Sequence, residues 1–182
     1  MSLPGPRFTY EDYLLLPEDK RYELIEGDFF MTPAPNIRHQ AIVGYLFATL
    51  WGFVRAHGLG AVFPAPTDVV LSSENVVQPD VLFVSKEQSG IIMKGAIHGA
   101  PDLVVEILSP STSSRDLVLK RKLYGRFGVQ EYWIVDPDAR TIEVLTPTAS
   151  GLDTWRQLSA AETLTSPLLP GFSIPLAEVF AD

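Results

Sequence analysis

The segment from Leu103 to Leu108 (LVVEIL) constrains the fold more than any other, because five of its six residues are apolar. A short apolar run of this kind predicts a strand at the centre of a sheet, buried on both faces. We expect a helix from Arg115 to Phe127, ended by Gly128, and then a second apolar strand from Glu131 to Val135 (EYWIV). A strand, a helix and a strand in this order predict a βαβ crossover.

The residues before this crossover predict two helices and several short strands. We expect a short helix from Thr9 to Leu15, and a longer one from Ile37 to Ala56, where apolar residues recur at intervals of three and four. The strands are expected within Arg21–Met31 (two strands around the turn Glu26-Gly27-Asp28) and at Gly60–Pro64, Thr67–Leu71 and Asp80–Val84. Residues 85–101 contain three glycines and are expected to form a loop.

The C-terminal part predicts elements that complete the sheet. Thr141–Leu145 is expected to pair back on the Glu131 strand as a hairpin, and Trp155–Leu158 to form an edge strand. Pro167–Phe180 is expected to be a tail packed on the sheet, with a final short helix. The whole order predicts an α/β fold, a mixed sheet flanked by helices, in one domain over residues 1–182.

Some classes of protein and site are excluded or disfavoured. The chain has no cysteine, which excludes disulfides, thiolate zinc sites and a cysteine nucleophile. No apolar run approaches the roughly 18 residues that would indicate a membrane span. The N-terminus lacks the basic and then apolar pattern of a signal peptide. We therefore expect a cytoplasmic protein that does not cross a membrane.

Two acidic residues stand where apolar strands are expected. Glu106 lies inside LVVEIL, and Asp80 follows Pro79 at the start of VLFV. A carboxylate in a core strand is costly unless a cation or strong donors meet it, so the two acids could converge on one ion. Carboxylate oxygens suit Mg²⁺ or Mn²⁺. Alternatively, Asp80 caps a turn and Glu106 pairs with an arginine or lysine.

A lysine on the following helix is the next candidate. Asp116, Lys120 and Tyr124 are spaced by four and share one helix face, whereas Lys122 points away from Lys120. A lysine near a scissile phosphate can stabilise developing negative charge or position a water molecule. The competing interpretation is a solvated lysine paired with Asp116, which is the commoner fate of helix lysines.

Other residues are weaker candidates. His39 could touch the site or a substrate phosphate, or simply lie at the surface or cap the helix; His57 and His98 look like loop residues, and the spacing of the three does not predict a zinc site. Asp102 is the first rival to Asp80. The residues that can cap the helix after Leu108, or hold a phosphate at its N-terminus, are Ser109, Ser111 and Thr112. The residues expected in a core or interface, rather than stacked against bases, are Gln130–Trp133 and the aromatic residues Phe29, Phe30 and Trp51.

Long segments of the chain resemble one family. PDVLFV, followed by DLVVEILSPSTSSRDLVLKRKLYGRFGVQEYWIVDPDARTIEV, is similar to a restriction endonuclease family that was first described as a bacterial domain of unknown function. That family belongs to the PD-(D/E)-x-K nuclease superfamily. The resemblance also includes RYELIEGDFF and PAPNIRHQAIVGYL, so it covers most of the chain.

The resemblance implies a restriction-endonuclease-like fold, here with an extra N-terminal hairpin and C-terminal tail, that binds Mg²⁺ or Mn²⁺. Asp80 and Glu106 match the two metal-binding acids of the superfamily, and Glu23 matches an acid that many members add from the N-terminal region. The usual lysine, two residues after the second acid, is replaced by Leu108. In this family a lysine on the following helix takes its place, here Lys120, with Lys122 as the fallback.

The implied function is that of a Mg²⁺-dependent endonuclease that hydrolyses phosphodiester bonds of DNA. Asp80 and Glu106 would ligate the ion, Lys120 would position water or phosphate, and Glu23 would tune a second ion. A homodimer would be the simplest way to cut both strands. The net charge of -8 counts against a nucleic-acid substrate, since such binders usually carry a basic surface. Two alternatives stay open: an interaction module that has the nuclease fold but no effective cutting activity, and a hydrolase of another phosphate substrate.

Overall fold

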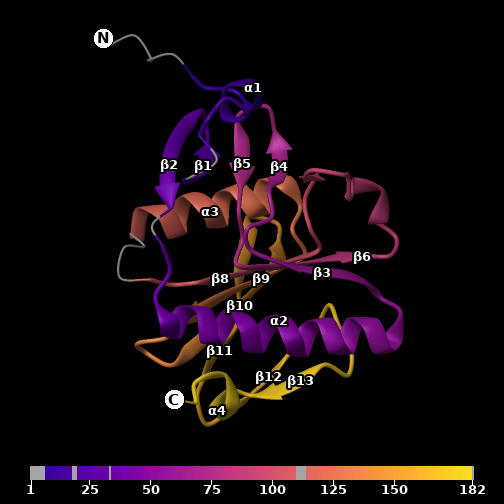
Figure 1. The fold of residues 1–182 in the computed structure, drawn as a ribbon. Coiled ribbons are helices and arrows are strands. Elements are labelled where there is room, and N and C mark those ends of the chain that lie inside the picture. Colours follow the sequence, from indigo (N-terminus) through magenta and orange to yellow (C-terminus); the bar gives the residue numbers. More distant parts are fainter. Residues whose placement is uncertain (1–6, 18–19, 33, 110–113, 182) are drawn as a thin grey trace.

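The computed structural model describes residues 7–17, 20–32, 34–109 and 114–181. Within them, a few helices separate runs of strands, and Figure 1 shows their arrangement. The helices are α1 (Tyr10–Tyr13), α2 (Ile37–His57), α3 (Ser114–Phe127) and α4 (Leu176–Val179), with a 3-10 turn, η1, at Ser89–Ile91. The strands are β1 (Arg21–Ile25), β2 (Asp28–Thr32), β3 (Gly60–Pro64), β4 (Val69–Ser72), β5 (Asn75–Val77), β6 (Val81–Ser85), β7 (Ile97–His98), β8 (Leu103–Ile107), β9 (Glu131–Asp136), β10 (Thr141–Thr148), β11 (Gly151–Ser159), β12 (Thr163–Thr165) and β13 (Ser173–Pro175).

The predicted crossover lies in a mixed six-stranded sheet with the order β11-β10-β9-β8-β6-β3. Strands β8 and β9 are parallel, with Glu106 opposite Ile134, and α3 connects them. The side chains of Leu103, Val104 and Val105 are fully buried because β8 has a neighbour on each side and packing on both faces. The prediction of a βαβ unit around an apolar central strand is confirmed.

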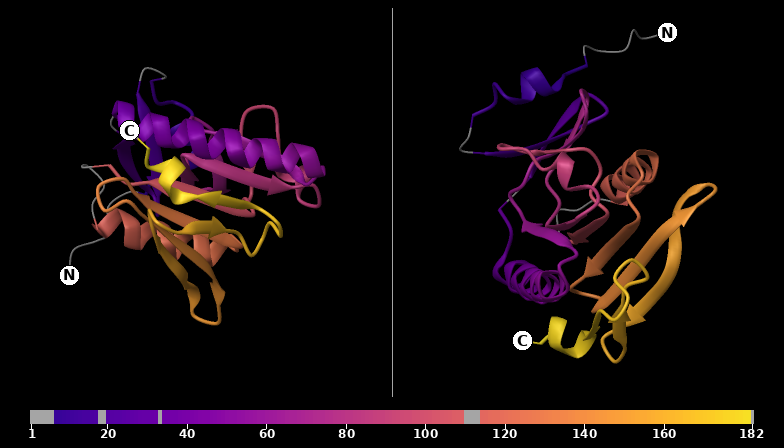
Figure 2. Two further views of the ribbon diagram at one scale, coloured as in Figure 1. Left: turned by 90° about the horizontal axis from the view of Figure 1, so that it is seen from below. Right: turned by 90° about the vertical axis from the view of Figure 1, so that its right-hand side faces the viewer.

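The two long helices cover opposite faces of this sheet. Helix α2 packs on the face that carries Val105 and Trp133, and α3 packs on the face that carries Val104 and Tyr132. Figures 1 and 2 show the sheet between the two helices, with the C-terminal segment on the α2 side. Glu106 follows Val105 in the strand, and its side chain therefore points to the α3 side.

The predicted mixed sheet flanked by helices is confirmed, and two further sheets that the sequence did not predict accompany it. The β1–β2 hairpin belongs to a second sheet with the order β2-β1-β5-β4-β7, and β12 pairs with β13 in a third, two-stranded sheet. The hairpin turns at Glu26 and Gly27, whose φ angles of 52° and 79° suit a tight turn between twisted strands. The link from the hairpin to the second sheet is the pairing of Leu24 with Val76. Strand β5 is too short to give a periodic signal, which is why the sequence did not predict this sheet.

Several element boundaries also differ from the expectations. Strand β6 begins at Val81, so Asp80 lies just before it. The expected loop 85–101 contains η1 and β7, and the predicted edge strand Trp155–Leu158 is part of the longer β11. His57 ends α2 and His98 lies in β7, so the prediction that both are loop residues was wrong. The elements within residues 85–101 are short, and much of β11 is solvent-exposed. Neither segment therefore shows the alternation of apolar and polar residues that marks a half-buried strand.

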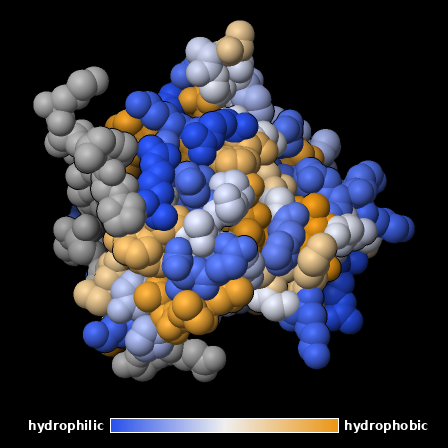
Figure 3. Space-filling view, turned by 90° about the horizontal axis from the view of Figure 1, so that it is seen from above, coloured by the Kyte–Doolittle hydropathy of each residue, from blue (hydrophilic) through white to orange (hydrophobic). Residues whose placement is uncertain are grey.

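The remaining features of the fold concern the surface and the helices of the described chain. Figure 3 shows that hydrophilic and apolar side chains alternate on the face seen from above, with no single kind covering it. No helix in the described part of the chain is long and apolar enough to cross a membrane. The cytoplasmic location and the single-domain organisation stay predictions.

Candidate active site

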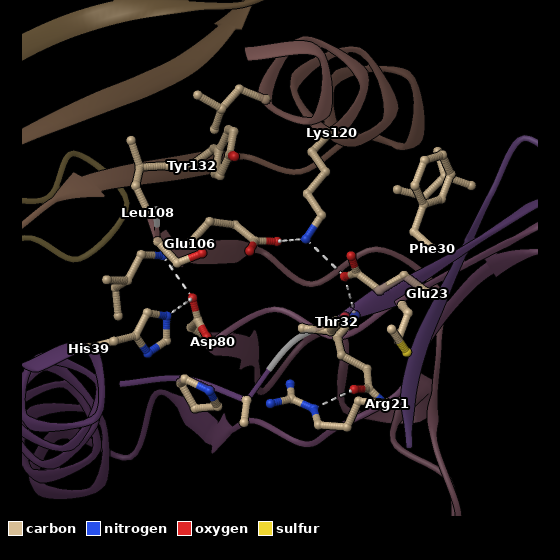
Figure 4. A pocket seen from close by; sticks show the side chains of 18 residues that line it. Arg21, Glu23, Phe30, Thr32, His39, Asp80, Glu106, Leu108, Lys120 and Tyr132 are labelled. Atoms are coloured by element: carbon tan, nitrogen blue, oxygen red, sulfur yellow. Dashed lines mark hydrogen bonds and ion pairs between the residues drawn. The ribbon is translucent and has the colours of Figure 1, made fainter. Parts of the chain in front are cut away.

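The predicted site residues meet in one cleft. Glu23 comes from β1, Asp80 precedes β6, Glu106 lies in β8 and Lys120 in α3, and all four line a cavity of about 210 Å³ (Figure 4). A volume of this size holds several water molecules, at roughly 30 Å³ each. The convergence of residues 80 and 106, on which the metal-site prediction depends, is therefore present in the fold.

Glu106 is largely buried and accepts two strong hydrogen bonds. Its Oε1 atom lies 2.9 Å from Lys120 Nζ and 2.6 Å from the Tyr124 hydroxyl, and its side chain is 12% exposed. Burial raises the pKa of Glu106 to about 7, although the charge of Lys120 opposes this shift. The carboxylate is thus held in a place where its negative charge is unfavourable without a further cation.

Lys120 joins two acids rather than facing solvent. Its Nζ atom lies 2.9 Å from Oε1 of Glu23 and 2.9 Å from Oε1 of Glu106, and only 14% of its side chain is exposed. Burial opposes the charged form, but the two carboxylates outweigh it and raise the pKa of Lys120. The ammonium therefore stays charged, and the interpretation of Lys120 as a solvated surface lysine was wrong. Lys122, the fallback, is exposed and does not line the cleft.

Asp80 is held on the opposite side of the cleft by a backbone group and a histidine. Its Oδ2 atom accepts a hydrogen bond from the Ile107 amide at 2.8 Å and lies 3.3 Å from His39 Nε2. Burial opposes protonation of His39, but the hydrogen bond and charge of Asp80 outweigh it and raise the pKa of His39. A positively charged His39 would stabilise the Asp80 carboxylate.

The sequence left the role of His39 open, and the structure places it in the site. Asn36 caps α2 by accepting a hydrogen bond from the His39 amide at 2.8 Å, which fixes the first turn of the helix. The signal was present in the spacing, because His39, Ile42 and Leu46 lie at intervals of three and four on the buried face.

Glu23 reaches the cleft because the second sheet brings β1 beside β5. Its Oε1 atom accepts hydrogen bonds from the Gln78 amide and from Lys120 Nζ, both at 2.9 Å. Gln78 in turn accepts a hydrogen bond from Arg21 Nε at 3.0 Å. The position of Glu23 therefore depends on a long-range sheet contact that local sequence patterns do not specify.

The cleft gathers carboxylates beside cationic side chains. Three carboxylates, those of Glu23, Asp80 and Glu106, line it together with Lys120, Arg21 and His39. Hard carboxylate oxygens fit a divalent cation such as Mg²⁺ or Mn²⁺. In the described part of the chain no three acidic or histidine side chains are grouped closely enough to form a complete metal site. The ion would therefore need other ligands besides Asp80 and Glu106.

The remaining candidates lie partly outside the cleft. Asp102 is buried elsewhere, where it accepts hydrogen bonds from the Ser85 amide at 2.6 Å and Gln88 Nε2 at 2.7 Å, so it does not replace Asp80. Ser109 lines the cleft, whereas Ser111 and Thr112 lie outside the described residues. The cleft residues that were not predicted to be there include the polar Arg21 and Gln78 and the aromatic Phe30 and Tyr132. The aromatic ones look like core residues in a sequence.

Comparisons with known proteins identify a family and a similar fold. The model of the Uma2 family, described as "Putative restriction endonuclease", matches residues 10–177. No curated protein matches the chain. A crystal structure of a "putative nuclease belonging to DUF820" from Anabaena variabilis ATCC 29413 superimposes with a TM-score of 0.81 at 23% identity, over 96% of this chain and 98% of that one. This likeness confirms the predicted fold class.

Proposed function

The chain belongs to the Uma2 family, and on this basis we propose that it is a metal-dependent endonuclease that hydrolyses phosphodiester bonds of DNA. The observation that carries the proposal is the gathering of Asp80, Glu106, Glu23 and Lys120 in one cleft, where three carboxylates converge beside a lysine. Glu23 is buried, and Asp80 and Glu106 are largely buried. Buried carboxylates cost folding free energy unless cations or donors meet them, so a bound cation would give these acids a function.

Asp80 and Glu106 are the residues that would hold Mg²⁺ or Mn²⁺. When bound, the ion would polarise the phosphate and lower the pKa of a water molecule. His39 and the Ile107 amide hold the Asp80 carboxylate in place, at 3.3 Å and 2.8 Å. These contacts orient a ligand before any ion arrives, which is the role of groups outside the first coordination shell.

Lys120 would stabilise negative charge on the phosphate or position the attacking water. Its Nζ atom lies beside Glu106 although Lys120 comes from α3, and position 108, directly after β8, is an apolar leucine. The ammonium is fixed by Glu23 and Glu106 at equal distances of 2.9 Å. A fixed, desolvated positive charge stabilises a transition state better than a mobile one in water.

One observation favours the alternative of a nuclease fold without cutting activity. Lys120 already joins Glu23 and Glu106, so part of the negative charge is compensated without an ion. If that arrangement is permanent, the cleft would be a structural ion-pair network. The endonuclease and the inactive nuclease fold differ in whether the purified protein binds a divalent cation.

Titration of Mn²⁺ into the full chain by calorimetry tests the proposal. We expect saturable binding that is lost in Asp80→Ala and retained in Glu87→Gln, where an exposed acid outside the cleft is changed. A parallel assay measures cutting of plasmid and of single-stranded DNA in Mg²⁺. Wild-type protein that binds no Mn²⁺ would favour the silent module. Binding without cutting of either DNA would point to another phosphate substrate.

We further propose that a homodimer cuts duplex DNA, because two copies of one cleft would serve the two strands. Light scattering on the purified chain measures the mass directly. A monomer that cuts both strands would contradict this part of the proposal and leave the metal site unaffected.

A further inference from the structure

Two buried polar side-chain atoms have no hydrogen-bond partner within the described residues. They are Nδ1 of His39 and the hydroxyl oxygen of Tyr132. Both residues line the cleft that holds the acids. Buried polar groups are nearly always paired, so two unpaired atoms at the same cavity indicate groups that find their partners in a bound ligand.

Tyr132 lies on the same face of the sheet as Glu106. It is opposite Val104 in the parallel pairing of β8 and β9, and its side chain is fully buried below α3. Its ring meets that of Tyr124 edge-on, with centroids 5.1 Å apart. Figure 4 shows the Tyr132 hydroxyl on the edge of the cleft, turned to the side from which Lys120 enters.

The neighbouring tyrosine shows what a structural role at this place looks like. The Tyr124 hydroxyl donates to Glu106 Oε1 at 2.6 Å, and Lys120 donates to the same atom at 2.9 Å. Oε1 of Glu106 is therefore supplied with donors without Tyr132. The Tyr132 hydroxyl keeps its proton, because burial and the nearby Glu106 charge raise its pKa well above the usual value. The Tyr132 hydroxyl can therefore donate a hydrogen bond to a group outside the described residues.

We propose that Tyr132 is a ligand-binding residue of this cleft, whose hydroxyl donates a hydrogen bond to an oxygen atom of the bound ligand. The inference rests on the proposed function, since it assumes that the cleft takes a phosphodiester and a divalent ion. The oxygen comes either from the phosphodiester or from a water molecule held by the ion. Both are strong acceptors, so the chemistry at the hydroxyl is the same.

The proposal predicts a change in thermal stability that differs from the change expected for a tyrosine with a purely structural role. An unpaired buried hydroxyl disfavours the folded state, so Tyr132→Phe removes a penalty and should leave the Tm of the unloaded protein equal to or above that of wild type. Tyr124→Phe is the matched control. It takes a donor from Glu106 and should lower the Tm.

The test is thermal unfolding of the full-length wild type and the two variants, each alone, with Mn²⁺, and with Mn²⁺ plus dimethyl phosphate. The ligand-induced rise in Tm reports the affinity for the folded state. We expect Tyr132→Phe to bind about tenfold more weakly or worse, as for the loss of a hydrogen bond to a charged group. Weakening with Mn²⁺ alone assigns the acceptor to a metal-held water, and weakening only with dimethyl phosphate assigns it to the phosphodiester.

Three outcomes would count against the inference. If unloaded Tyr132→Phe loses as much stability as Tyr124→Phe, the hydroxyl already has a partner in the empty protein. If the variant binds both ligands as tightly as wild type, the hydroxyl does not touch them. If wild type itself shows no rise in Tm with either ligand, the proposed function fails and the inference falls with it.

Discussion

Lys120 Nζ lies 2.9 Å from Glu106 Oε1, although one residue is on α3 and the other in the central strand β8. Helix α3 thus places a lysine beside the acid of β8, while position 108, directly after that strand, is a leucine. A positive charge beside Glu106 can come from either element, because only its position in space matters. The leucine at position 108 is therefore compatible with a lysine beside Glu106.

Glu106→Ala should abolish Mg²⁺-dependent cutting while the chain still folds. The change removes a proposed metal ligand, and the loss of cutting should be at least about 100-fold, as for a group that acts in the transition state. Plasmid cleavage measures the rate, and far-UV circular dichroism checks the fold. Cutting that survives in the folded variant would remove Glu106 from the mechanism.

Lys120→Met should lower both cutting and stability, because it leaves Glu23 and Glu106 buried without their shared cation. Breaking a buried ion pair from one side costs about 3 to 5 kcal/mol. Lys122→Met is the matched control, since Lys122 is exposed on the same helix and should change the free energy of unfolding by less than about 0.5 kcal/mol. Urea denaturation measures the free energy of unfolding of both variants. Equal effects of the two substitutions would contradict the role given to Lys120.

The central crossover could be predicted from the sequence because its signals are local. The apolar run at Leu103–Leu108, the helix after it and the apolar run at Glu131–Val135 each show their own pattern, and a βαβ unit is the usual way to connect them. Glu106 stood out for the same reason, as a charged residue within an apolar strand.

The rest of the site depends on contacts between distant segments. Glu23 reaches Lys120 through a second sheet whose β1–β5 pairing is a single register pair, Leu24 with Val76. Tyr132 reads as a core aromatic in EYWIV, and only its missing hydrogen-bond partner in the folded chain marks it out. Spacing cannot show such features, because they arise when elements far apart in sequence pack together.

Glu131 should make stability depend on pH. Burial raises its pKa, against hydrogen bonds from Trp133, the Leu168 amide and Ser166. The folded state therefore holds this proton more tightly than the unfolded state, so the contribution of Glu131 to stability is present below its usual pKa of 4.5 and is lost as the pH rises through the raised value.

Glu131→Gln removes that titration but keeps the size of the side chain. It should be less stable than wild type at low pH, because its amide nitrogen cannot accept the donors that the carboxyl oxygens accept. The difference in the free energy of unfolding between wild type and Glu131→Gln should become smaller from about pH 4 to about pH 8. Urea denaturation across this range gives the difference. A gap that is constant or widens would contradict the direction of the shift.

Replacement of two glycines by alanine should change the stability of the fold in opposite directions. At Gly60, where φ is 151°, an added Cβ would overlap the carbonyl oxygen of Val84 in the paired strand, so Gly60→Ala should destabilise the fold by about 2 kcal/mol or more. Gly52 lies within α2 with open space around it, and Gly52→Ala should stabilise by about 0.5 to 1 kcal/mol. Thermal unfolding of both variants tests the pair. The same sign for both would show that the backbone at Gly60 can adjust.

His39→Ala should weaken Mn²⁺ binding without removing it. His39 Nε2 lies 3.3 Å from Asp80 Oδ2, and its role is to orient this proposed ligand rather than to replace it. Loss of such a supporting group typically weakens metal binding by about 10- to 100-fold. His57→Ala is the control, since His57 lies at the exposed end of α2 and outside the cleft. Calorimetry measures both affinities. Complete loss of binding in His39→Ala would make His39 a direct ligand, whereas an unchanged affinity would mean that the Ile107 amide alone suffices to hold Asp80.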